Sequence, residues 1–137
     1  MLADAITVLS NAWDKGGYDT KGKDKTSDRP AATTTVNAAF AMGPSHESQL
    51  GQENGQLNNL IRFLEDWKKV DFTYQGSLVA LWHSQIATEY FRCCGNGGDN
   101  YYNPPNRIWG YDTLFNTNPP PGTPMGIIIT RGPWSEG

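Results

Sequence analysis

The sequence lacks the features that mark several common classes of functional protein. Its 137 residues contain only two cysteines and two histidines, and no stretch approaches the ~20 consecutive apolar residues of a membrane-spanning helix. With 11 basic and 14 acidic side chains the formal net charge is −3, and no basic stripe is present to neutralise phosphates. We therefore expect one domain, 1–137, that holds no membrane span and binds no nucleic acid.

The two cysteines, Cys93 and Cys94, are neighbours in the chain. A bond between adjacent residues closes a small strained ring, so this pair does not suit a disulfide that joins distant segments. No Cys-x-x-Cys pattern and no zinc-ligand spacing accompanies it. Reduced thiols, a link to another chain and a redox-active pair remain open, and we predict no metal and no cofactor.

Turn-forming residues and aromatics fill the chain instead, with 15 glycines, 9 prolines, five tryptophans and six tyrosines. This composition predicts a mainly β domain with long loops, either β-solenoid-like or compact. Alternation of apolar and polar residues predicts strands at 5–10, 33–42 and 125–130, with weaker strand character at 108–115. The longest strand is expected within 67–88, where Gly76 marks a bulge or a close approach of backbone.

One amphipathic α-helix is predicted at about 56–69. Apolar residues there recur at steps of three and four, which is the spacing of one helix face: Leu57, Leu60, Ile61, Leu64 and Trp67. Lys68 and Lys69 follow at the end where cations favour a helix dipole. We expect this helix to cover an open end or face of the strands.

No catalytic constellation is visible. His83 and Ser84 are adjacent, so on a strand they point to opposite faces and cannot form a base–nucleophile pair. A Gly-x-Ser-x-Gly elbow is absent as well. We therefore predict that the protein is not an enzyme.

Sugar binding is the alternative that the aromatic residues suggest. Tyr101, Tyr102, Trp109 and Tyr111 fall in one short window together with Asn and Arg. Aromatic faces can stack on sugar rings, but the same side chains could instead attach a Pro-rich loop to the core.

Several long motifs occur in a fixed order: "ADAITVLSNAW", "RPAATTTVNAAFAMG", "LIRFLEDW", "FTYQGSLVALWHSQIAT" and "YYNPPNRIWGYDTLF". Together they resemble the C-terminal region of bacterial pilin-like, PilX-like cell-surface proteins, which include the hormogonium polysaccharide biosynthesis type. The resemblance covers Ala3 to about Trp134. No catalytic residue can be transferred from that family.

The resemblance implies an extracellular, cell-surface or type IV pilus-associated structural protein that acts in adhesion, motility or surface assembly. Its expected partners are copies of itself or a chain that bears a prepilin helix, and a polysaccharide is a further possibility. Because the prepilin helix of the family is not part of this sequence, we expect the C-terminal part of a longer or split surface protein. A pilin-like α+β head is the alternative fold.

Overall fold

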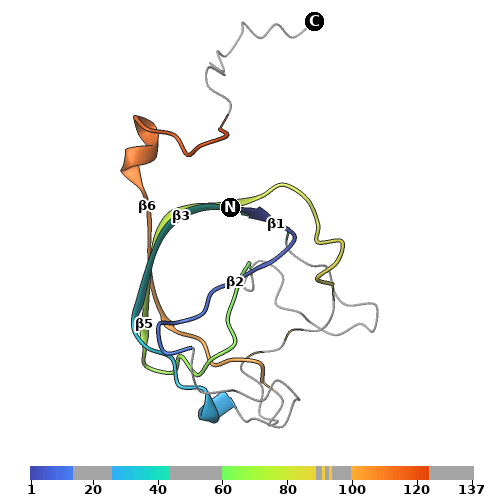
Figure 1. Cartoon of the computed structure of the whole chain (residues 1–137), viewed down its shortest axis with the longest axis vertical. Helices are drawn as coiled ribbons and strands as arrows, with labels where there is room; N and C mark the ends of the chain where they lie inside the picture. The colour runs from blue at the N-terminus through green and yellow to red at the C-terminus, as the bar shows by residue number, and fades with distance from the viewer. Residues whose placement is uncertain (14–25, 44–59, 89–90, 92, 94–99, 124–137) are drawn as a thin grey trace, which may run out of the picture.

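The computed structural model describes residues 1–13, 26–43, 60–88, 91, 93 and 100–123. These residues form a mainly β protein with two parallel sheets (Figure 1). The larger sheet has four strands in the order β1-β3-β5-β6, with bounds Leu2–Ala3, Thr34–Met42, Asp71–Ala80 and Asn106–Tyr111. The smaller sheet pairs β2 (Ile6–Thr7) with β4 (Ile61–Arg62), and two short 3₁₀ helices, η1 (Thr26–Asp28) and η3 (Thr113–Asn116), complete the described elements.

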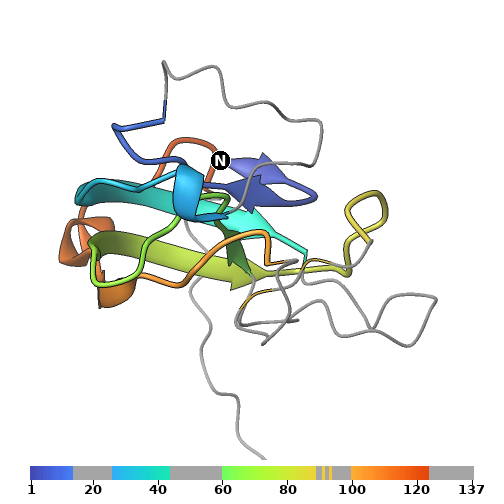
Figure 2. The ribbon, with the colours of Figure 1, turned by 90° about the horizontal axis from the view of Figure 1, so that it is seen from below.

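The chain passes the same places repeatedly, always in the same direction. It runs from β1 to β2 and Pro30, then from β3 to β4 and Asp66, and then from β5 to Asn103 and β6. We call each of these three runs of the chain a pass. Each pass pairs with the next, because Pro30 forms a parallel β-bridge with Asp66, and Asp66 forms one with Asn103. Figure 1 looks along this stack and shows the passes as a ring, and Figure 2 shows β1, β3 and β5 lying side by side.

The core lies inside this ring and is largely aromatic. Phe63 is at its centre, with ring centroids 5.2 Å from Trp67, 5.2 Å from Phe72 and 5.7 Å from Tyr102. The remaining buried core side chains are Ile6, Val8, Phe40, Met42, Ile61 and Tyr74. They come from all three passes, so burial of apolar surface holds the passes together.

The strand prediction at 33–42 is confirmed by β3, and Phe40 and Met42 point into the core as the alternation predicted. The prediction of a long strand within 67–88 is confirmed by β5. Gly76 is a point of close approach in it, because a Cβ atom there would lie 1.8 Å from the carbonyl oxygen of Ala38. Strands β3 and β5 bend together along the ring (Figure 1).

The predicted helix at about 56–69 is wrong over its described part, 60–69. The chain there forms β4, a bridge at Asp66 and a turn in which Val70 N donates to Trp67 O at 2.9 Å. Ile61, Phe63, Glu65 and Trp67 are all buried, so the true period is two. Lys69 ends this turn with φ 65° rather than capping a helix. Residues 56–59 lie outside the described part of the chain, as does the strand predicted at 125–130.

Candidate functional site

The most distinctive surface feature lies where β6 leaves β5. Strand β5 pairs with β3 on one edge as far as Met42↔Ala80. On its other edge β5 pairs with β6 only as far as Gly76↔Tyr111. The last bond across this second pair runs from Asp112 N to Gly76 O, at 3.3 Å. Beyond it the chain turns into η3, which Asp112 caps by accepting a hydrogen bond from Leu114 N at 3.0 Å. The cap therefore ends the pairing early, so a notch remains beside Ser77–Ala80.

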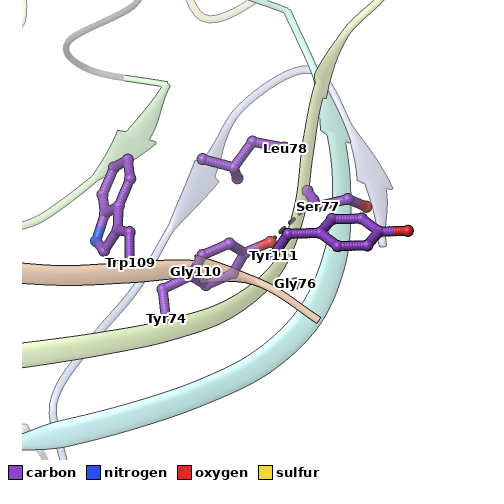
Figure 3. A pocket seen from close by; sticks show the side chains of 7 residues that line it. All are labelled: Tyr74, Gly76, Ser77, Leu78, Trp109, Gly110 and Tyr111. Atoms are coloured by element: carbon purple, nitrogen blue, oxygen red, sulfur yellow. Dashed lines mark hydrogen bonds between the residues drawn. The ribbon is translucent and has the colours of Figure 1, made fainter. Parts of the chain in front are cut away.

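An open hollow of about 400 Å³ occupies the inner side of this notch (Figure 3). It is lined by Tyr74, Gly76, Ser77, Leu78, Trp109, Gly110 and Tyr111. Gly110 leaves its rim open, since a Cβ atom there would meet nothing within 4 Å. A hollow of this size falls within the range of small-ligand sites.

Trp109 forms the wall of the hollow and is 42% exposed. Its ring lies edge-on to Tyr74, with the two ring centroids 6.1 Å apart. The Arg107 guanidinium lies 5.2 Å from the centroid of the Trp109 ring, a cation–π contact. Tyr111 is 57% exposed, but its ring points away from that of Trp109 (Figure 3). These two predicted residues therefore share one hollow without presenting parallel faces.

Hydrogen bonds of Tyr74 hold the floor of the hollow. The Tyr74 hydroxyl lies 2.6 Å from Ala38 O and 2.9 Å from Ser77 O, so its proton serves two carbonyls of the bent sheet. Burial raises the pKa of Tyr74 to about 12, because the charged phenolate is poorly solvated there. Tyr74 therefore stays protonated at neutral pH and positions backbone; it is not an acid or base for chemistry.

A second, larger hollow of about 790 Å³ lies on the outer face of the same bend. Small and apolar residues of the outward positions line it, including Ala39, Ala41, Val79 and Leu81, together with Pro119, Pro120 and Pro121. Leu81 is 70% exposed and Val79 38%. The outward residues at the end of β5 are therefore apolar without being buried.

The other two predicted sugar-binding residues lie elsewhere. Tyr101 is 43% exposed and stacks on Phe91 with centroids 4.9 Å apart, whereas Tyr102 is 1% exposed and belongs to the core. Burial raises the pKa of Tyr102, and its hydroxyl accepts a hydrogen bond from Arg107. Neither residue lines the hollow beside Trp109. Tyr102 has no free ring face, so it attaches its loop to the core.

His83 and Ser84 lie on opposite sides of the chain. His83 is exposed, and Ser84 is buried, with its hydroxyl 2.9 Å from Asp4 O and 2.7 Å from Gly43 O. Gly43 permits this crossing, because a Cβ atom there would lie 2.6 Å from Ser84 N. Ser84 therefore connects all three passes of the chain and is not available as a nucleophile.

The carboxylate of Asp4 closes the same corner. It accepts hydrogen bonds from the backbone N–H groups of Ala87, Gln85 and Ile86 at 2.8, 2.8 and 2.9 Å. These donors hold the pKa of Asp4 below its usual value, because they stabilise the charged form. The sequence offered no sign of this role, which depends on residues more than 80 positions apart.

Glu65 is a fully buried carboxylate that the sequence pattern also concealed. Its Oε1 accepts from the Ser10 hydroxyl at 2.5 Å and its Oε2 accepts from Ser10 N at 2.6 Å. The same Ser10 oxygen accepts from Ala12 N and Ala32 N. Every oxygen of this pair is used to join the first pass to the second, so the pair holds structure together.

The backbone of Cys93 forms a parallel β-bridge with Tyr102. The Cys93 sulfur is in a disulfide bond, and Cys94 lies outside the described residues. Within the described part of the chain, no three metal-ligating side chains gather at one point, and no helix is long and apolar enough to cross a membrane. No protein-family model, curated protein or solved structure matches this chain.

Proposed function

We propose that the chain is a β-solenoid-like, non-enzymatic structural subunit of an extracellular surface or pilus-type assembly, where it serves adhesion, motility or surface organisation. The observation that carries the proposal is the parallel stack of passes that ends in an edge strand, β6. A parallel ladder with a free edge can be continued by another chain, and natural proteins use such edges for association.

Three polar residues that join the passes favour the same function. Glu65, Ser84 and Asp4 are engaged in hydrogen bonds that join successive passes. No acid, base or nucleophile among them faces either hollow. Their chemistry is that of a rigid scaffold, which suits a structural subunit better than an enzyme.

The test is association in solution as a function of protein concentration. Light scattering over a wide concentration range should show growth of larger species for the unaltered chain. Ile108→Lys places a charge on the exposed side of β6, where Ile108 is 53% exposed, and should reduce association because edge charges oppose strand addition. Thr7→Lys, at an exposed position of β2, is the matched control. A chain that stays monomeric at every concentration would refute the proposal.

Carbohydrate binding at Trp109 and Tyr111 is the second candidate. The favouring observation is the open hollow beside an exposed indole, since exposed aromatic faces bind sugar rings. Calorimetric titration with soluble polysaccharides should give binding that Trp109→Ala abolishes and Tyr101→Ala leaves intact. Binding that survives Trp109→Ala would exclude this site.

A further inference from the structure

The uncovered part of β5 is four residues long. Among the described residues, Ser77–Ala80 pairs with β3 on one edge and with nothing on the other, because β6 ends its pairing at Gly76. The gap directly continues the β5–β6 ladder, so any strand placed there would extend an existing sheet.

The backbone groups that face the gap can be assigned. Gly76 O accepts from Asp112 N, so Gly76 directs its polar groups toward β6. Alternate residues of a strand direct their N–H and C=O groups to the same side. The N–H and C=O groups of Leu78 and Ala80 therefore point, like those of Gly76, to the edge of β5 that β6 leaves unpaired. No described residue pairs with them there. Unpaired ladder groups at an open edge are a template for an added strand.

The two hollows lie on opposite faces of this edge. The inner hollow contains Leu78 and Trp109, and the outer hollow contains Val79 and Leu81. An extended peptide places successive side chains on opposite faces of a sheet. A strand in the gap would therefore send alternate side chains into the two hollows while its backbone paired with β5.

We infer that the notch is a docking site for an extended, uncharged segment of a partner polypeptide, which adds to β5 along Ser77–Ala80. The absence of charge follows from the lining, since no residue that lines either hollow has an Asp, Glu, Lys, Arg or His side chain. The N-terminal ammonium of Met1, which also lines the outer hollow, donates to Ala39 O at 2.6 Å. Because successive side chains enter opposite hollows, apolar or small uncharged side chains at successive positions match the two hollows in turn. This inference rests on the proposed function and names the kind of contact by which such an assembly would form.

The test is titration of the full chain with a labelled, capped pentapeptide of alternating valine and threonine, followed by fluorescence anisotropy. Backbone amide shifts in a nuclear magnetic resonance spectrum locate the site, and the largest are expected between Gly76 and Leu81. The same peptide with N-methyl groups on alternate amides cannot complete the ladder. It should bind at least about tenfold more weakly, the equivalent of one lost hydrogen bond.

Ala80→Pro removes an N–H from the unpaired edge of β5, and Ala80→Val keeps this N–H at the same exposed position. The first variant should lose about tenfold in affinity and the second should not. Binding that N-methylation leaves unchanged, shifts that map elsewhere, or no binding at millimolar peptide would overturn the inference. So would binding that Trp109→Ala alone abolishes while Ala80→Pro has no effect, because that pattern belongs to a ring-stacking site.

The two proposals can fail separately. Peptide binding at the notch by a chain that never associates would refute the assembly proposal and support the docking site. Association that neither N-methyl peptide nor Ala80→Pro affects, with no peptide binding, would refute the docking site and leave the assembly proposal standing.

Discussion

Gly76 is the position at which the bent sheet is most sensitive to one added methyl group. A Cβ atom there would lie 1.8 Å from Ala38 O, 2.8 Å from Ala38 C and 2.8 Å from the Tyr74 hydroxyl. The first contact must lengthen by about 1.6 Å to reach ordinary van der Waals distance, which begins at 3.4 Å. Two of the three contacts involve backbone of the neighbouring strand, so a change of rotamer cannot relieve the clash.

The expected cost of Gly76→Ala follows from what must move. Overpacking a rigid site costs about 1–3 kcal/mol, and each disrupted buried hydrogen bond adds about 1 kcal/mol. With the Tyr74 hydroxyl displaced from Ala38 O and Ser77 O, we expect about 3–5 kcal/mol. A domain of this size is stable by about 5–15 kcal/mol in total. The variant should therefore be strongly destabilised or unfolded.

Urea denaturation measures the effect, and Gly110→Ala is the matched control. Gly110 lies on β6 in the same sheet, yet a Cβ atom there meets nothing within 4 Å. It should be neutral or stabilising by up to about 1 kcal/mol, because alanine restricts the unfolded chain. At a denaturant slope of about 2 kcal/mol per molar, Gly76→Ala should lower the urea midpoint by about 2 M. Equal midpoints for the two variants would refute the close approach of β3 and β5.

Three further predictions concern the polar groups that join the passes. Ser84→Ala should destabilise by about 1–3 kcal/mol in urea because two buried carbonyls lose their donor, whereas Ser27→Ala, at an exposed position, should cost under about 0.5 kcal/mol; equal losses would contradict the buried role. Glu65→Gln should cost about 2–3 kcal/mol, since a weaker acceptor replaces the carboxylate and the new amide protons lack acceptors; an unchanged midpoint would show that Glu65 is not bonded as described. The pKa of Asp4 is lower in the folded chain than its ordinary value of 3.8, so the contribution of Asp4 to the free energy of unfolding is complete above pH 3.8 and is lost as the pH falls below it. Asp4→Asn should therefore flatten the acid limb of a plot of stability against pH. An unaltered acid limb would contradict this.

The strands of the larger sheet were predictable where the alternation is clean. In β3 the inward residues Phe40 and Met42 are bulky and the outward residues are small or polar, so period two is unambiguous. The prediction failed at residues 60–69, where a helix was expected, because Ile61, Leu64 and Trp67 also match a helical spacing. The alternation there includes Glu65 at an inward position, and a charged residue at such a position is normally counted as exposed.

The candidate site depends on information that a local pattern does not contain. Trp109 and Tyr111 could be named from the sequence as candidate sugar-binding residues, but the hollow beside them exists because β6 stops pairing with β5 at Gly76. The end of the β5–β6 pairing is set by Asp112, which caps η3. It also depends on the register of β5 and β6, whose paired residues lie 35 positions apart in the chain, as in Asp71↔Asn106. Tyr102 has the same composition signal as its neighbours, and only its contacts with Phe63 and Arg107 place it in the core.

The polar residues at the corners of the ring follow one physical rule. At the corners of the ring the sheets end, and backbone N–H and C=O groups that no ladder pairs must find side-chain partners. Ser10, Ser84 and Asp4 each lie at such a corner and bond backbone from another pass. These side chains are engaged in the hydrogen bonds that join the passes, which supports the structural function proposed above. Among the described residues, no strand pairs with the edge of β5 beside Leu78 and Ala80, and a partner is therefore expected to bind there.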